Sequence, residues 1–168
     1  FSGDVLSGLY DLTSTLDITN FEVTTAEDTL TSSGDSTVRL NTLNTPAVSA
    51  SVSGNSLTVS SNTASETLTN YSSAQTLDAG LTPAPYTMDS NGTLDSSQLP
   101  GIVEFSTELL FQGFDNDYPS IGGLLVTGDT SSARLIALDN VNVRIEIDNN
   151  DDGTVDDIID TTWDALVN

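Results

Sequence analysis

The sequence predicts an all-β protein, an antiparallel meander that forms a sandwich or a barrel, with at most short helical turns at the termini. Three observations support this fold class. Apolar and polar residues alternate with a period of two over most of the chain, turn residues such as Gly-Asn separate the alternating runs, and only the two ends show helical spacing. A chain of 168 residues has the usual length of one domain, so we expect residues 1–168 to form a single all-β domain.

Two strands are predicted in the first part of the chain, with a helix as the alternative at its N-terminal end. Residues Leu12 to Val23 and Val38 to Leu43 alternate as strands do, and they lie on either side of the turn-forming stretch Ser32 to Asp35. The helical alternative depends on apolar residues that recur at intervals of four, three and four positions: Val5, Leu9, Leu12 and Leu16.

A hairpin is predicted between Ala47 and Ser61. The pair Gly54-Asn55 lies between two alternating runs, and such a pair favours a two-residue type II′ turn. This turn gives two apolar pairs on one face of the hairpin: Val52 with Leu57, and Ala50 with Val59.

A second hairpin is predicted at Asn91-Gly92. A two-residue turn there sets Asp89 opposite Leu94, whereas a three-residue loop sets Met88 opposite Leu94, and we favour the second register. The surrounding stretch from Thr45 to Ser97 is rich in Ser and Thr and is the least patterned part of the chain. We expect it to include long loops or an edge that docks elsewhere.

The last third of the chain has the clearest strand patterns. In Ile102 to Gln112 the odd positions are mostly apolar and the even positions mostly polar, and Val141 to Asp148 alternates in the same way. The other predicted elements are a strand over Arg134 to Leu138, a loop at Asp139-Asn140, a loop over Asn149 to Gly153, a strand over Thr154 to Thr162 and one helical turn over Trp163 to Val167.

The charge balance is strongly acidic. The chain has 25 acidic residues against three arginines, contains no Lys or His, and carries a formal net charge of -22. Such a surface repels phosphate groups, so we expect no nucleic-acid partner.

No apolar run approaches the ~18 residues that cross a bilayer, so we expect no direct insertion in a membrane. Salt or divalent cations reduce the repulsion between acidic groups, which favours high-salt or calcium-containing surroundings.

Composition also bears on location and assembly. Ser and Thr are abundant while Lys is missing, which is typical of an extracellular or cell-surface protein, and the lack of Cys means that no disulfide stabilises the fold. Lys on an exposed sheet edge is a usual protection against pairing with another chain. Because this protection is missing, we expect a homo-oligomer or a filament.

The aspartate-rich stretch Asp148 to Asp157 is a candidate calcium site. Its oxygen ligands follow an EF-hand-like loop, with side chains at positions 1, 3, 5 and 9 and a main-chain carbonyl at position 7, which gives the set Asp148, Asn150, Asp152, Asp156 and Thr154. Position 12 is Ile159 instead of a bidentate Glu, so Asp157, Asp160 or a remote loop has to complete the site. We therefore expect weak affinity, about 10⁻⁴ to 10⁻³ M. A solvated turn without metal is the alternative.

Few side chains suit catalysis. Without Cys, His and Lys the chain cannot assemble a Ser-His-Asp, Cys-His or Ser-Lys nucleophile. A glycosidase needs only two carboxyl groups, but Glu104, Glu108 and Glu146 all lie on the polar faces of predicted strands. We expect no enzymatic activity, and a carboxylate-dependent glycosidase is the less favoured hypothesis.

The function that this pattern favours is an exported, acidic structural or adhesion module at the cell surface, with a weak calcium site and self-assembly through sheet edges. The alternative is a module that binds a small hydrophobic molecule or a glycan in a β-barrel or on its loops. This alternative predicts either a roomy apolar interior lined by Phe105, Leu109, Phe111 and Val143, or exposed aromatic residues near Tyr118. Trp163 is expected to anchor the core against the last strand.

From Tyr118 to Leu166 the chain has, in order, a Tyr-Pro turn, a Thr-Gly hairpin, an alternating strand, an Asp-rich turn and a Thr-Trp end. This order resembles the tail of secreted or lipid-anchored β-rich surface proteins of marine-type bacteria, a family without a known function. The resemblance covers about the last third of the chain and implies export and β structure. The chain has no Cys to which a lipid could be attached.

Overall fold

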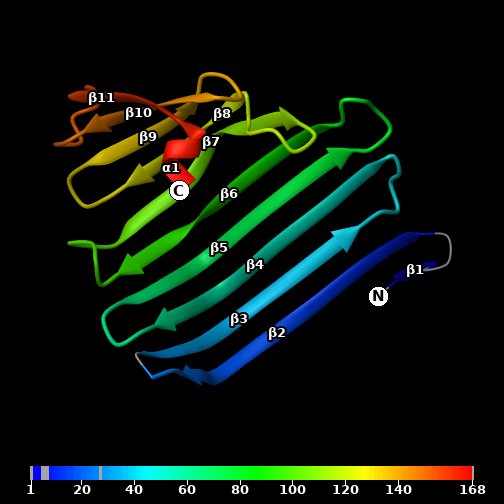
Figure 1. Ribbon diagram of the computed structural model, residues 1–168, viewed down its shortest axis with the longest axis horizontal. Helices are drawn as coiled ribbons and strands as arrows, with labels where there is room; N and C mark the ends of the chain where they lie inside the picture. The colour runs from blue at the N-terminus through cyan, green and yellow to red at the C-terminus, as the bar shows by residue number, and fades with distance from the viewer. Residues whose placement is uncertain (1, 5–7, 27, 168) are drawn as a thin grey trace.

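The computed structural model describes residues 2–4, 8–26 and 28–167. Eleven strands form one antiparallel sheet in which each strand pairs with its neighbours along the chain (Figure 1). The elements are β1 (Ser2–Asp4), β2 (Leu9–Thr24), β3 (Thr29–Asn41), β4 (Ala47–Ser60), β5 (Ser65–Asp78), β6 (Pro85–Ser96), β7 (Val103–Phe114), β8 (Ile121–Thr127), β9 (Ser132–Ala137), β10 (Asn142–Asp148), β11 (Asp157–Thr162) and α1 (Trp163–Val167). The predicted all-β meander with a short helical turn at its end is confirmed.

The sheet has β1 and β11 at its two edges. Figure 1 shows β2 to β6 side by side as one broad layer, whereas β8 to β11 twist away from that layer at the C-terminal end. Within the described part of the chain there is neither a second sheet, as in a sandwich, nor a strand pair that closes a barrel. The sheet is therefore open, and much of it is a single layer.

Several predictions in the C-terminal half are confirmed. The alternating stretches at Ile102 to Gln112 and Val141 to Asp148 form β7 and β10, and the loop at Asp139-Asn140 joins β9 to β10. The predicted alternation is clear in β7, where Phe111 is 5% exposed between exposed neighbours. It is less regular around β10, where Val143 is 0% exposed but Val141 of the predicted apolar set is 54% exposed and Asp148 of the predicted polar set is buried. The helical turn at Trp163–Val167 is present as α1.

The predicted hairpin at Gly54-Asn55 is wrong, because β4 passes straight through this pair. Val52 does not pair with Leu57 but lies between Val38 of β3 and Ser73 of β5. The glycine makes room for a ring: a Cβ atom on Gly54 would lie 2.5 Å from the Tyr71 hydroxyl. That hydroxyl donates a hydrogen bond to the main-chain oxygen of Asp35 at 2.8 Å.

The turns predicted at Asn91-Gly92 and at Ser32 to Asp35 are wrong for the same reason. Asn91-Gly92 lies inside β6, where Met88 pairs with Gln75 and Phe111 instead of Leu94, and the register with β7 shifts between Met88 and Asn91. The stretch Ser32 to Asp35 lies inside β3. Residues that are common in turns are here placed at irregularities within long strands, because bulges also need such residues.

Two further expectations are corrected by the long strands. The helical spacing of Leu9, Leu12 and Leu16 falls in β2, where pairing with β3 from Asp11 to Thr24 overrides the local pattern. Val5 lies outside the described residues. The Ser/Thr-rich stretch from Thr45 to Ser97 is not mainly loop, since it contains β4, β5 and β6.

The buried core is small and lies at the C-terminal end. Its buried apolar members are Phe111, Ala137, Val143 and Trp163, with Met88, Leu124 and Leu135 packed against them. The Phe111 and Trp163 rings meet edge to face with centroids 6.2 Å apart. The Trp163 indole N–H donates to the main-chain oxygens of Pro119 and Asp139, both at 3.2 Å. The expectation that Trp163 anchors the core is therefore confirmed.

Cross-strand register gives the broad layer two different faces, because residues opposite each other in a ladder share a face. One face carries the apolar side chains of β2 to β6, and we call it the apolar face. It includes Leu12, Leu16, Ile18, Phe21 and Val23 of β2, Leu30, Val38 and Leu40 of β3, Val48, Val52, Leu57 and Val59 of β4, and Leu68, Tyr71 and Leu77 of β5. The opposite, polar face is lined mainly by Ser, Thr and Asp.

Candidate functional site

The predicted calcium ligands all lie in the turn between β10 and β11. Asp148 ends β10 and is 7% exposed. Its Oδ1 accepts hydrogen bonds from the main-chain N–H groups of Asn150 at 3.2 Å and Asp152 at 3.3 Å, and its Oδ2 accepts one from Gly153 at 2.7 Å. The buried carboxylate therefore organises the turn through the N–H groups of the turn itself.

The other predicted ligands also contact the turn's own N–H groups. Asp152 accepts from the main-chain N–H of Thr154 at 2.8 Å, which lowers the pKa of that carboxyl group. Asn150 donates its side-chain amide to Asp152 at 3.2 Å, and Asp156 accepts from the main-chain N–H of Asn149 at 2.8 Å. Among the described residues no group of three or more His, Cys, Asp or Glu side chains has the arrangement of a metal site. Calcium binding stays a prediction.

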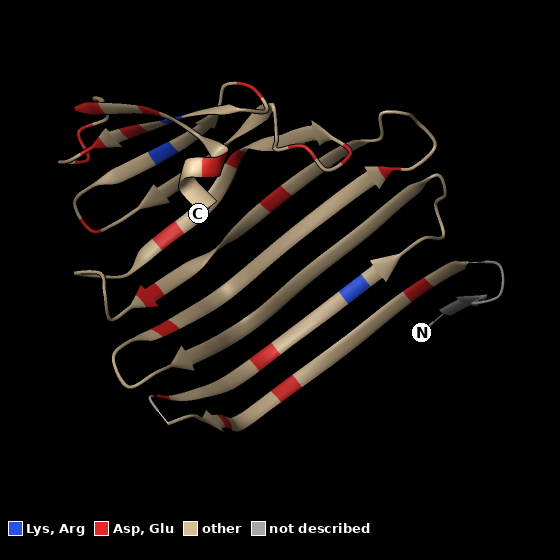
Figure 2. Cartoon of the chain, viewed as in Figure 1, with Lys and Arg blue, Asp and Glu red and all other residues tan. Residues whose placement is uncertain are grey.

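All three arginines lie in ion pairs with carboxylates. Arg39 contacts Asp11 with its Nε at 2.9 Å, Arg134 contacts Glu108 with its Nη2 at 3.1 Å, and Arg144 contacts Asp160 with its Nε at 2.8 Å. Each guanidinium lowers the pKa of its carboxyl partner, because its hydrogen bonds favour the charged form. Figure 2 shows the few basic positions of the chain in blue among the many acidic ones in red.

Two of the three glutamates considered for glycoside hydrolysis are brought together by Arg134. This arginine binds Glu108 and lies 3.9 Å from the Glu146 carboxylate. Glu104 lies farther along β7, opposite Thr127 of β8. The sequence prediction missed this cluster, because it depends on the pairing of β7 to β10. The rarity of Arg in so acidic a chain is the signal that could have indicated it.

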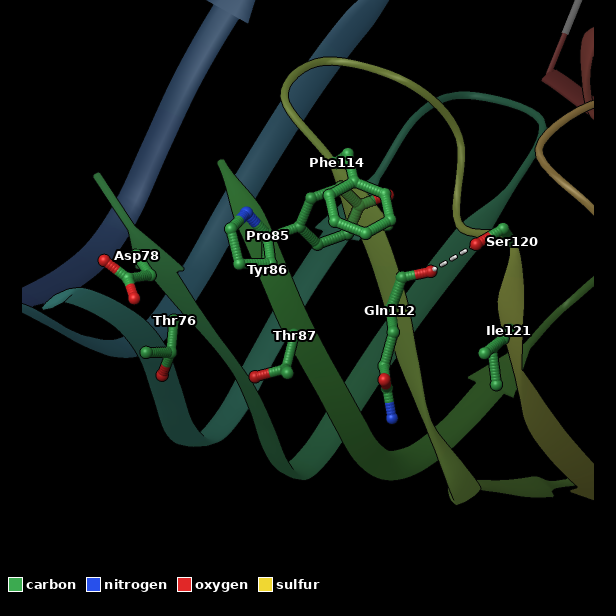
Figure 3. A pocket seen from close by; sticks show the side chains of 10 residues that line it. Thr76, Asp78, Pro85, Tyr86, Thr87, Gln112, Phe114, Ser120 and Ile121 are labelled. Carbon is green, nitrogen blue, oxygen red and sulfur yellow. Dashed lines mark hydrogen bonds between the residues drawn. The ribbon is translucent and has the colours of Figure 1, made fainter. Parts of the chain in front are cut away.

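The residues expected to line an apolar interior do not share one environment. Phe111 and Val143 are packed in the core at 5% and 0% exposure, whereas Leu109 is 53% exposed at a register shift of β7. A hollow of about 270 Å³ instead lies over the ends of β5 to β8, between residues that include Tyr86, Gln112 and Phe114 (Figure 3). It is slightly smaller than the ~300–1,000 Å³ usual for ligand pockets.

Tyr86 illustrates how this hollow is built. Its hydroxyl donates to the main-chain oxygen of Asp117 at 2.8 Å, and burial raises the pKa of the phenol. A Cβ atom on Gly113 would lie 2.5 Å from this hydroxyl, so the ring lies directly over the glycine. The Tyr86 ring is therefore a fixed wall of the hollow.

Tyr118 is the partly exposed aromatic residue near the C-terminal end. Its ring stacks on Trp163 with centroids 5.9 Å apart and an angle of 18°, and its hydroxyl donates to Asp164 at 3.0 Å. This hydrogen bond and the charge of Asp164 raise the pKa of Tyr118. One face of the Tyr118 ring is occupied by Trp163, and the side chain as a whole is 36% exposed.

Asp139 gives a prediction for the dependence of stability on pH. Its carboxylate accepts the side-chain amide of Asn142 at 3.1 Å and the main-chain N–H groups of Asn142 at 2.7 Å and Val141 at 2.8 Å, and these bonds lower its pKa. A lowered pKa gives stability that is complete above the unfolded value of ~3.9 and is lost as pH falls through the folded value. We expect Asp139→Asn to lower the melting temperature at pH 7, with the gap closing below about pH 4.

Thermal melts of both proteins from pH 7 to pH 3 check this prediction. The exposed Asp129 in the turn between β8 and β9 is the control, since Asp129→Asn removes the same charge at another turn. A gap for Asp139→Asn that stays constant down to pH 3 would show that its carboxylate charge does not support the loop.

Comparison of the chain with protein-family models, with curated proteins and with solved structures returns no match. Among the described residues no helix combines the length and the apolar character that crossing a membrane requires.

Proposed function

We propose that this protein is an exported, acidic structural or adhesion module of the cell surface that self-assembles through its sheet edges. The observation that supports the proposal best is the outer edge of β2. β1 pairs only with Leu9 to Asp11, and among the described residues no strand pairs with the outer side of β2 from Leu12 to Thr24. An unpaired edge of this length is a template for a strand of another chain.

The main-chain N–H and C=O groups that point outward from this edge belong to alternate residues of β2. Thr42 donates its main-chain N–H to the oxygen of Tyr10 at 2.8 Å, and the Tyr10 N–H donates to the Thr42 hydroxyl at 2.9 Å, so both groups of Tyr10 point toward the β3 side. Because these groups alternate along an antiparallel strand, those of Thr13, Thr15 and Asp17 point outward. A bulge at Asn20, which has a φ of 50°, ends the regular part of the edge.

Calcium is part of the proposal. The turn from Asp148 to Asp156 concentrates carboxylates at the other end of the sheet, next to the edge strand β11. A divalent cation that binds there reduces the repulsion between chains that each carry a net charge of -22. The binding is expected to be weak and to support assembly, and no enzymatic activity is proposed.

A glycan or small-molecule binding module is the second candidate. It is favoured by the hollow of about 270 Å³ beside Tyr86 and Phe114 and by the partly exposed ring of Tyr118. Both features are small, which is why we favour the structural module.

Sedimentation velocity over a range of salt concentrations tests the proposed function. We expect species larger than a dimer in high salt, and we expect millimolar calcium to lower the salt that is needed. Thr13→Pro removes an outward N–H and should suppress these species, while Thr13→Val keeps that N–H and should not. Asp152→Asn should remove the calcium effect alone. If no species beyond a dimer forms under any of these conditions, edge assembly is rejected.

A further inference from the structure

The apolar face of the broad layer is uncovered over β2 and β3. Six large apolar side chains on these two strands are between 40% and 57% exposed: Leu12, Leu16, Phe21, Val23, Leu30 and Val38. The small core under α1 lies at the other end of the sheet and does not cover them. Figure 1 shows α1 lying near β7, away from β2 and β3.

An open single layer exposes more accessible surface than a compact domain of the same mass. The chain of 17.6 kDa exposes 10313 Å². A monomer of this mass usually exposes about 7,900 Å², so about 2,400 Å² is in excess. A standard protein interface buries about 800 Å² on each partner, and permanent dimers bury more. This excess is spread over the whole open sheet, and it is about three times the area that a standard interface buries on one partner.

The apolar face carries almost no charge. In β2 to β6 the register places a single acidic residue on it, Glu66, which accepts a hydrogen bond from Ser96 at 2.8 Å. The other acidic residues of these strands, such as Asp11, Asp17 and Asp89, lie on the polar face or at bulges and ends. Two chains with a net charge of -22 can therefore meet through this face with Glu66 as the only carboxylate that each brings to it from β2 to β6.

The pattern of large and small side chains on the apolar face also suits packing against the same face of a second copy. In the middle of the two strands, large residues on β2 lie opposite small ones on β3, as in the pairs Leu16 with Ser36, Ile18 with Gly34 and Phe21 with Ser32, whereas towards the ends Leu12 lies opposite Leu40 and Val23 opposite Leu30. At Ser14 and Val38 the order is reversed, with the large residue on β3. Alternation of large and small residues lets two layers interdigitate, and sheets that pack face to face do so about 10 Å apart.

We propose that a second copy of this chain covers the apolar face, so that the β2 to β5 layers of two chains pack as a two-sheet sandwich with two-fold symmetry. This inference deepens the proposed function, since it names the partner of one surface of a self-assembling subunit. It uses the face of the sheet and not its edge, so the two can be tested separately.

The test measures the dissociation constant of the dimer by sedimentation equilibrium in high salt, in a Thr13→Pro background that blocks edge pairing. We expect Leu16→Glu and Val38→Glu each to raise this constant about tenfold or more. The matched controls Thr15→Glu and Thr37→Glu add the same charge at the next position of the same strand but on the polar face. We expect the controls to change the constant less than about threefold.

Three outcomes would overturn the inference: a monomeric Thr13→Pro protein at all concentrations, face variants that dimerise like their controls, or controls that dissociate as much as the face variants. The first outcome needs no face variant to fold. A Thr13→Pro dimer without larger wild-type species would reject edge assembly and leave the sandwich dimer intact. If the wild-type protein forms larger species while the Thr13→Pro protein is monomeric, edge assembly is supported and the sandwich dimer is rejected.

Discussion

Replacing Phe111 with alanine is expected to lower the free energy of unfolding by about 3–5 kcal/mol. The side chain is 5% exposed and forms the centre of the small core with Val143 and Trp163. Domains of this size are stabilised by only about 5–15 kcal/mol, and a core of so few buried residues cannot redistribute the loss. Urea unfolding measures the change in the free energy of unfolding. The fluorescence of Trp163, the single tryptophan, reports it, since this ring contacts Phe111.

Phe114→Ala is the matched control for this prediction. Phe114 ends the same strand, is 48% exposed, and loses the same number of atoms on substitution. We expect a change of less than about 1 kcal/mol, because surface substitutions are usually close to neutral. Equal losses at the two positions would mean that the C-terminal cluster is not the stabilising core.

Gly34→Ala is expected to cost about 2–6 kcal/mol. Gly34 has a φ of 137°, a conformation that costs other residues about 1–3 kcal/mol. A Cβ atom would also overlap the main-chain oxygen of Ser56 and lie 2.7 Å from the Cα of Leu57, and overpacking of this kind costs about 1–3 kcal/mol more. Because the contacts are with the main chain of β4, no side-chain rotation relieves them.

Gly101→Ala is the control for Gly34→Ala. No heavy atom lies within 4 Å of the Cβ position at Gly101, so thermal melting should be nearly unchanged. A Gly34→Ala protein that melts like wild type would show that β3 and β4 do not approach each other as closely as described. The same result would favour the turn that the sequence predicts at Ser32 to Asp35 over a continuous β3.

Local sequence chemistry predicts some of the candidate site but not all of it. The turn after Asp148 is recognisable, because Asp and Asn bind N–H groups only two to five positions away in the chain. The cluster of Glu108, Arg134 and Glu146 is not, because Arg134 lies 26 residues from Glu108 and meets it only through strand pairing. The same holds for Tyr71, whose hydroxyl reaches Asp35 across β4.

The sequence by itself determined that the chain forms strands, which side chains share a face within each regular run, and where acidic residues concentrate. These properties follow from a period of two and from charge, and both are local. Only the tertiary structure decided that Gly54-Asn55 and Asn91-Gly92 continue strands instead of reversing them. The same dipeptide fits a turn or an irregular strand, and the choice depends on ladders and rings from neighbouring strands. The open single layer is likewise a property of the whole sheet, because each hairpin is compatible with closure or with an uncovered face.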